Sequence, residues 1–141
     1  MQPGKAEVLV EGKDQMIWVS GALVRQGLKA VENLRRAGHD VGLVDARFIK
    51  PLDEELLGRH LRSRQGLVVV EEHQRAGGFG SAVLEVASRL PEVKARVRLL
   101  GIPDRYVDHM TSREEQLAQA GVDAAAIEKA CLAQARSSVP Q

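Results

Sequence analysis

The spacing of apolar residues along the chain changes between the alternation of a strand and the three-and-four spacing of a helix. Short apolar runs rich in β-branched residues predict strands, and longer stretches with one apolar stripe predict helices. The predicted strands are 6–10, 16–20, 41–44, 66–72 and 97–100. The predicted helices are 23–36, 53–64, 81–90, a short one from 112, and 123–135. We expect the tail 137–141 to fray.

Single residues predict where several of these helices begin and end. Gly38 follows the first helix, and glycine adopts the left-handed conformation of a helix end at little cost. Asp53 is expected to cap the second helix with its carboxylate. Pro91 stops the third helix, and Ser112 with Glu115 has the spacing of a capping box.

Strands that alternate with helices predict a three-layer α/β/α domain with a five-stranded, mixed and mostly parallel sheet. Residues 11–14 join the first two strands, which we expect to form a hairpin or a close pair. This connection is too short for a parallel crossover, so the first strand is expected to run antiparallel. The 141 residues fit one domain.

Composition excludes several classes of function. Lys and Arg total 20 and Asp and Glu total 19, so the formal net charge of +1 offers no general field for nucleic acid or membrane. No apolar run approaches the roughly 20 residues that span a bilayer. A lone cysteine, Cys131, excludes a disulfide framework. With no apolar signal region after Met1, we expect a cytoplasmic protein.

The carboxyl ends of the parallel strands are the expected place for a ligand. One strand end is followed by a glycine-rich turn that opens a helix, where backbone N–H groups could hold a phosphate. This turn contains Gly77, Gly78, Phe79 and Gly80. It lacks the spacing of a dinucleotide or P-loop fingerprint. The favoured interpretation is a tight turn that lets helix and strand pack closely.

The same strand ends with two groups capable of proton transfer. Glu71 and His73 alternate onto one side, where a carboxylate could tune an imidazole. No nucleophile or second base accompanies them in the sequence. A solvated or interfacial strand end is therefore the favoured interpretation.

The densest polar group follows the last predicted strand. It consists of Asp104, Arg105, Tyr106, Asp108 and His109. Arg105 could bind a carboxylate or phosphate through two hydrogen bonds, or it could pair with a neighbouring aspartate at a subunit contact.

The histidines, the basic segment 59–64 and the cysteine are expected to have structural roles. The four histidines have no metal-ligand spacing, so a zinc site is not expected. Residues 59–64 (RHLRSR) are interpreted as the solvated face of a helix end, where cations complement the dipole. Cys131 lies on an apolar helix stripe and is expected to fill core space.

Several phrases occur in the order found in a known family. They are Gly4–Leu9 (GKAEVL), Glu11–Asp14 (EGKD), Asp45–Asp53 (DARFIKPLD), Val70–His73 with Gly77–Ser81, and Gly101–Tyr106 with His109. Together they resemble the C-terminal domain of 1-deoxy-D-xylulose-5-phosphate synthase, within the wider transketolase C-terminal-domain family. The resemblance covers nearly the whole chain, so residues 1–141 are expected to form one such domain.

The resemblance implies a thiamine-diphosphate-dependent transferase that joins pyruvate and glyceraldehyde 3-phosphate, with loss of carbon dioxide, on the non-mevalonate route to isoprenoids. In this family, the first two of three domains hold thiamine diphosphate and magnesium. The third contributes mainly to packing of the homodimer. We therefore expect no catalytic, cofactor-binding or metal-binding residue in this chain, and we expect the remaining domains of the enzyme as partners. The candidate interface or anion-contact residues are His73, Gly77, Gly78, Phe79, Gly80, Asp104, Arg105, Tyr106 and His109.

Two alternatives remain open at this stage. The chain could be the C-terminal part of a split transketolase or of a 2-oxo-acid dehydrogenase β subunit. It could also be a stand-alone module that binds a small anion through Arg105 and backbone donors. Met1 followed directly by the opening phrase suggests either a truncated piece or the product of a split gene.

Overall fold

Strands and helices alternate along the chain, as the pattern predicts. The computed structural model describes residues 4–20, 23–47, 52–71, 78–101 and 122–137. The strands are β1 (Glu7–Val10), β2 (Gln15–Val19), β3 (Val41–Asp45), β4 (Gly66–Glu71) and β5 (Arg96–Gly101). The helices are α1 (Val24–Arg36), α2 (Glu54–Ser63), α3 (Phe79–Arg89) and α5 (Ala124–Ser137). The predicted helix from Ser112 lies outside the described residues.

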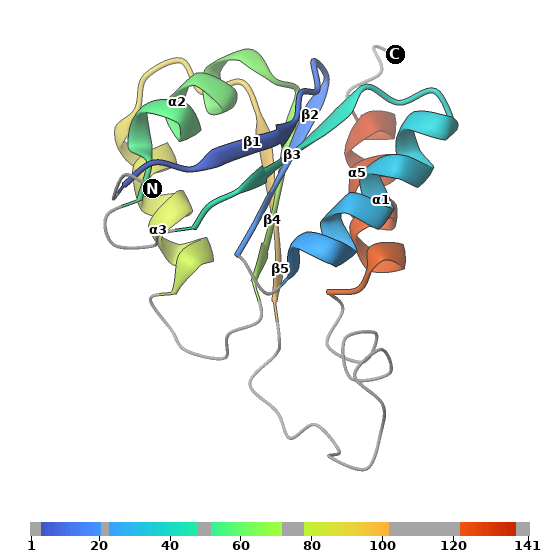
Figure 1. Cartoon of the computed structure of the whole chain (residues 1–141). Coiled ribbons are helices and arrows are strands. Elements are labelled where there is room, and N and C mark those ends of the chain that lie inside the picture. The colour runs from blue at the N-terminus through green and yellow to red at the C-terminus, as the bar shows by residue number, and fades with distance from the viewer. Residues whose placement is uncertain (1–3, 21–22, 48–51, 72–77, 102–121, 138–141) are drawn as a thin grey trace.

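The five strands form one sheet in the order β1-β3-β2-β4-β5. Strands β2 to β5 run parallel, and β1 pairs with β3 in the antiparallel direction. Helices α1 and α5 cover one face of the sheet, and α2 and α3 cover the other (Figure 1). This arrangement confirms the three-layer fold, the mostly parallel sheet and the antiparallel first strand.

The expected hairpin between the first two strands is wrong. Strand β3 lies between β1 and β2, so the connecting residues cross over the start of β3. Gly12 and Gly42 make this crossing possible, because a Cβ atom on either glycine would collide with backbone atoms of the other. The backbone N–H of Asp14 donates to the carbonyl of Asp40 at 3.0 Å and fixes the far end of the connection.

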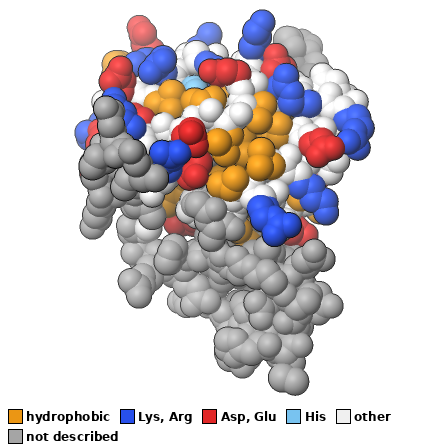
Figure 2. Space-filling view, viewed as in Figure 1, with side chains coloured by type: hydrophobic (Ala, Val, Ile, Leu, Met, Phe, Trp, Pro, Cys, Tyr) orange, Lys and Arg blue, Asp and Glu red, His pale blue; other side chains and the backbone are white. Residues whose placement is uncertain are grey.

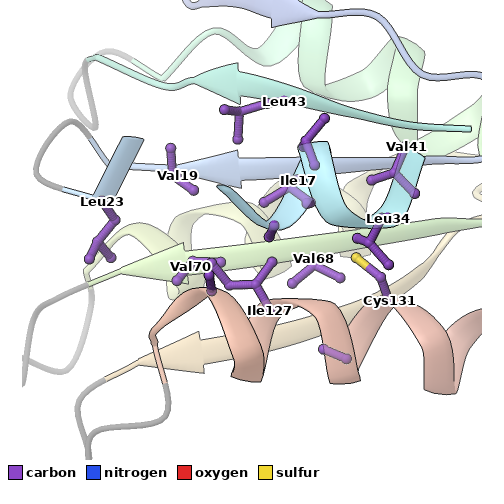
Figure 3. Packing of buried hydrophobic residues seen from close by; sticks show 14 of the residues in the cluster. Ile17, Val19, Leu23, Leu34, Val41, Leu43, Val68, Val70, Ile127 and Cys131 are labelled. Atoms are coloured by element: carbon purple, nitrogen blue, oxygen red, sulfur yellow. The ribbon is translucent and has the colours of Figure 1, made fainter. Parts of the chain in front are cut away.

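The first hydrophobic cluster lies between the sheet and helices α1 and α5. Ile17 and Val68 of the sheet pack with Leu34 of α1 and with Ile127 and Cys131 of α5 (Figure 3). All five side chains are at most 3% exposed. Burial raises the pKa of the Cys131 thiol to about 12. The structure confirms Cys131 as part of the core.

The second cluster lies between the sheet and helices α2 and α3. It contains Trp18, which is fully buried against Leu57, Leu61 and Phe79. His60 of α2 lies beside Trp18, only 3% exposed. The interpretation of residues 59–64 as a solvated face is therefore wrong at this position, because the helical period turns His60 and Leu61 toward the sheet.

The predicted helix ends are confirmed at two positions. Asp53 caps α2, and its Oδ1 atom accepts from the backbone N–H of Leu56 at 3.2 Å. Its Oδ2 atom accepts from the N–H of Ala6 at 2.9 Å, which ties the start of the chain to α2. Gly38 follows α1 with a φ of +94°. None of the described helices has the length and hydrophobicity that crossing a membrane requires.

Candidate functional site at the carboxyl edge of the sheet

The four parallel strands end at the same edge of the sheet. The arrows of β2, β3, β4 and β5 point in one direction (Figure 3). Their last residues are Val19, Asp45, Glu71 and Gly101. This edge is where a ligand is expected in an open α/β sheet. The candidate loops therefore start side by side, as the sequence predicts.

Six of the predicted site residues lie outside the described residues, namely His73, Gly77, Asp104, Arg105, Tyr106 and His109. Gly78, Phe79 and Gly80 are described, and they form the start of α3. The site can therefore be described from the ends of the strands and from the first turn of this helix.

The carboxylate of Glu71 lies at the N-terminus of α3. Its Oε2 atom accepts from the backbone N–H of Phe79 at 2.8 Å, and its Oε1 atom accepts from that of Gly80 at 3.0 Å. First-turn N–H groups have no partner within their own helix and attract anions. An external phosphate would have to displace Glu71 from these two donors. The geometry therefore supports the tight-turn interpretation over a phosphate cradle.

Close packing explains the glycine at position 80. A Cβ atom on Gly80 would lie 3.0 Å from Glu71 Oε1 and 3.3 Å from Leu99 Cδ1. Phe79 inserts its ring into the second core cluster and is fully buried. Helix α3 begins two residues earlier than predicted. A strand-end acid followed by a glycine-rich helix start is the signal that predicts this contact.

The end of β3 is held by a pair of charges that the sequence analysis did not single out. The backbone of Arg47 has a φ of +59°, and its N–H donates to Asp45 Oδ1 at 3.0 Å. Such a turn is typical of aspartate. The guanidinium of Arg47 donates to Glu7 Oε1 of β1 at 2.6 Å. The positive charge of Arg47 is therefore paired within the chain.

The N-terminus of α5 is also satisfied by the chain itself. Asp123 Oδ1 accepts from the backbone N–H of Ala126 at 3.0 Å. The side-chain oxygen of Gln26 on α1 accepts from the N–H of Ala124 at 3.0 Å. The starts of α3 and α5 thus bind groups of the protein. These hydrogen bonds fix the described part of this edge.

Exposed leucines lie in two places: near the start of α3, and on the face formed by β1 and α1. Leu99 of β5 contacts the Gly80 position and is 39% exposed, and Leu84 follows Gly80 by one turn of α3 and is 45% exposed. On the face shown in Figure 2, hydrophobic side chains gather over β1, β3 and the start of α1. The exposed leucines of β1 and α1 are Leu9 and Leu28. Such patches are typical of protein contact surfaces.

The strand order and the layers define a three-layer α/β domain with a mixed sheet. Residues 4–127 match the family model described as "Transketolase, C-terminal domain". The chain belongs to this family.

Known relatives are much longer than this chain. It is 47% identical over 132 residues to 1-deoxy-D-xylulose-5-phosphate synthase of Thermus thermophilus, and 44% identical over 129 residues to that of Aquifex aeolicus. The matches cover 92% and 90% of this chain but 20% of each relative. The chain therefore spans about one fifth of the length of these curated relatives.

Solved structures support the same fold. A split-gene transketolase, an inactive β4 tetramer, has a TM-score of 0.82 and 32% identity, over 95% of this chain and 42% of that chain. Transketolase from Campylobacter jejuni has a TM-score of 0.62 and 16% identity, over 92% of this chain and 18% of that chain. The second likeness shows the fold alone.

Proposed function

We propose that this chain is the C-terminal domain of a thiamine-diphosphate-dependent 1-deoxy-D-xylulose-5-phosphate synthase and acts by packing against the rest of the enzyme. The observation that carries the proposal is the 47% identity over 92% of the chain, which corresponds to only 20% of the relative. The complete enzyme would join pyruvate and glyceraldehyde 3-phosphate in the cytoplasm, as a homodimer, for isoprenoid precursor synthesis.

The contribution of this domain would be positional. A rigid neighbour that fixes the orientation of catalytic groups raises the rate, because small misplacements in an active site are costly. Asp53 joins the start of the chain to α2, Glu71 joins β4 to α3, and Arg47 joins β1 to the end of β3. These contacts make the domain rigid, and other domains would pack against its surface.

Thiamine diphosphate and magnesium would be held by the remaining domains. Within the ranges that the structure describes, no three His, Cys, Asp or Glu side chains are grouped as possible metal ligands. We therefore assign this chain no step that involves either group.

The contact with the rest of the enzyme would involve the surface formed by Leu84 and Leu99. Both side chains are exposed; Leu99 lies beside Gly80, one of the candidate interface residues, and Leu84 lies one turn further along α3. Burial of a leucine side chain removes apolar surface from water and gives about 1.5–3 kcal/mol when complete. Leu84 and Leu99 would therefore add apolar contact area to this interface.

A complementation experiment tests this function. The Thermus thermophilus synthase without its matching C-terminal segment is assayed for pyruvate-dependent formation of the sugar phosphate, with and without this chain. We expect added chain to restore activity in a saturable manner. Measured binding without any gain in activity would contradict the positional role.

Two matched variants test the surface. Leu84→Glu and Leu28→Glu place one charge on side chains of similar exposure, 45% and 42%, on opposite faces of the sheet. We expect Leu84→Glu to weaken complementation at least tenfold, since a buried unpaired carboxylate opposes docking, and Leu28→Glu to leave it unchanged. The reverse result would assign the contact to the β1 and α1 face and overturn the proposed surface.

A split transketolase is the second candidate. It is favoured by the TM-score of 0.82 to the split-gene transketolase, of which this chain covers 42%. The same assay separates the two functions when a transketolase lacking its C-terminal segment is offered beside the truncated synthase. We expect restoration of the synthase only. Restoration of ketose–aldose transfer instead would support the second candidate.

A further inference from the structure

A basic groove lies between the edge strand β5 and helix α5. Its volume is about 590 Å³, and it is lined from the strand by Arg96, Arg98 and Leu100 and from the helix by Lys129 and Gln134, with small apolar residues between them. Arg96, Arg98 and Leu100 project on the same side of β5, because alternate residues of a strand share a face. The groove thus opens on the α5 side of the sheet, apart from the turn at Gly80.

Three positive charges line the basic groove, and no acidic residue does. Within the described ranges, Arg96, Arg98 and Lys129 form no ion pair, whereas six other basic side chains do. The acidic neighbour Glu128 turns away, since its Oε2 atom accepts from Asn33 Nδ2 of α1 at 3.0 Å. Among the described residues, no acidic side chain therefore neutralises the positive charge of the groove.

Hydrogen bonds between α5 and the sheet fix the two walls of the basic groove in the absence of a ligand. The side-chain amide of Gln134 donates to the carbonyl of Arg96 at 2.8 Å and to that of Leu67 at 3.4 Å. These bonds hold α5 against β5 and β4. A site whose walls are already ordered loses less conformational entropy on binding.

Positive charge continues beyond one end of the basic groove. A smaller hollow of about 190 Å³ is lined by Ser63, Arg64, Gln65, Lys94 and Arg96, so Arg96 stands between the two hollows. Arg64 is paired there with Glu11 at 3.4 Å. Like charges close together repel one another, and a concave surface concentrates their field. Binding of a multivalent anion would relieve this repulsion.

We infer that the basic groove is a binding site for a small multivalent phosphate compound, such as a phosphate ester or a diphosphate. Its volume lies within the range of roughly 300–1,000 Å³ typical of small-molecule sites. Guanidinium groups match phosphate oxygens through paired hydrogen bonds. Ala126, Ala130 and Leu100 provide apolar wall for the carbon skeleton of such a ligand. The inference does not depend on the proposed function.

The test is a titration of the full chain with pyrophosphate, followed by backbone amide NMR at low ionic strength. We expect saturable shifts at residues 96–100 and 126–134 with millimolar or tighter affinity. We expect the double variant Arg98→Gln with Lys129→Gln to bind about tenfold or more weakly, because each lost charge removes a charge-assisted hydrogen bond.

A matched control distinguishes a site from general charge attraction. Arg25→Gln with Lys29→Gln removes the same two charges from exposed positions of α1 that do not line the groove. We expect this control to change the affinity less than twofold. Shifts that persist in the groove variant, or equal losses in both variants, would overturn the inference. Binding of an acidic peptide without binding of pyrophosphate would overturn it as well.

Discussion

The buried pair Trp18 and His60 shows how burial and a hydrogen bond favour the neutral form of a histidine. The indole N–H of Trp18 donates to Nδ1 of His60 at 3.0 Å, and the rings meet nearly edge to face at 78°. Nδ1 can accept only when it carries no proton. Burial first, and then the charges of Arg64 and Arg59, lower the pKa of His60 to about 4.

This shift predicts a pH-dependent stability. Between about pH 6.5 and pH 4 the unfolded histidine takes up a proton and the folded one does not. Stability from His60 is therefore complete above pH 6.5 and decreases as the pH falls toward 4, by up to about 3 kcal/mol. The measurement is urea unfolding at several pH values, followed by the fluorescence of the only tryptophan.

His60→Gln provides the comparison, because it keeps an acceptor and does not titrate. We expect its free energy of unfolding to change less with pH than that of the wild type. His39→Gln, in the turn after α1, should keep the wild-type dependence. Identical pH profiles for the wild type and His60→Gln would contradict the assignment.

Glu71 should matter for stability through the first turn of α3. Glu71→Ala leaves the N–H groups of Phe79 and Gly80 without their acceptor, and we expect a loss of about 1–2 kcal/mol in urea unfolding. Glu85→Ala, on the exposed side of the same helix, should remain within about 0.5 kcal/mol of the wild type. A loss no larger for Glu71 than for Glu85 would show that the contact contributes nothing.

Among the elements, the segment that joins β1 to β2 differs most from the prediction, because it crosses over β3 instead of forming a hairpin. Local pattern places strands at β1 and β2 correctly, but strand order depends on which backbones can approach one another. Gly12 and Gly42 lie thirty residues apart in the chain and meet face to face. Nothing in the local periodicity reveals this contact, whereas the cap at Asp53 uses neighbours three residues away and is predictable.

The crossing predicts a sharp difference between two glycine substitutions. Gly42→Ala would drive a Cβ atom into the backbone at Val10 and Gly12, so we expect a loss of more than about 3 kcal/mol. Gly58→Ala, inside α2, meets the tip of Leu90 at 3.3 Å and the end of the Arg62 side chain at 3.7 Å, so stability should change by at most about 1 kcal/mol.

Unfolding in urea measures both changes, and hydrogen exchange at β1 identifies where the structure opens. We expect the amides of β1 to exchange faster in Gly42→Ala than in the wild type. Equal stability of the two alanine variants would show that the crossing tolerates a side chain.

At the scale of the whole molecule, both faces of one sheet carry a separate core. Cys131 lies in the first core, 1% exposed, between α5 and the sheet. A thiol with a pKa of about 12 is almost entirely protonated at neutral pH, and only the thiolate reacts with disulfide reagents. Its reactivity therefore depends on opening of the entire layer.

We expect the native protein to resist labelling by an aromatic disulfide reagent at pH 8. The rate should rise with urea in parallel with the unfolded fraction, because unfolding restores an ordinary thiol pKa. Ser88→Cys in a Cys131→Ala background, an exposed position on α3, should react at once. Rapid labelling of the native wild type would contradict close packing around Cys131.

The sequence by itself determined the periods of strands and helices, the layered α/β class and the helix ends at Gly38 and Asp53. These features depend on residues close together in the chain, whose preferences act locally. Tertiary structure alone decided that β3 separates β1 from β2 and that Arg98 and Lys129 share one groove. These features depend on contacts between distant residues, which no local pattern encodes.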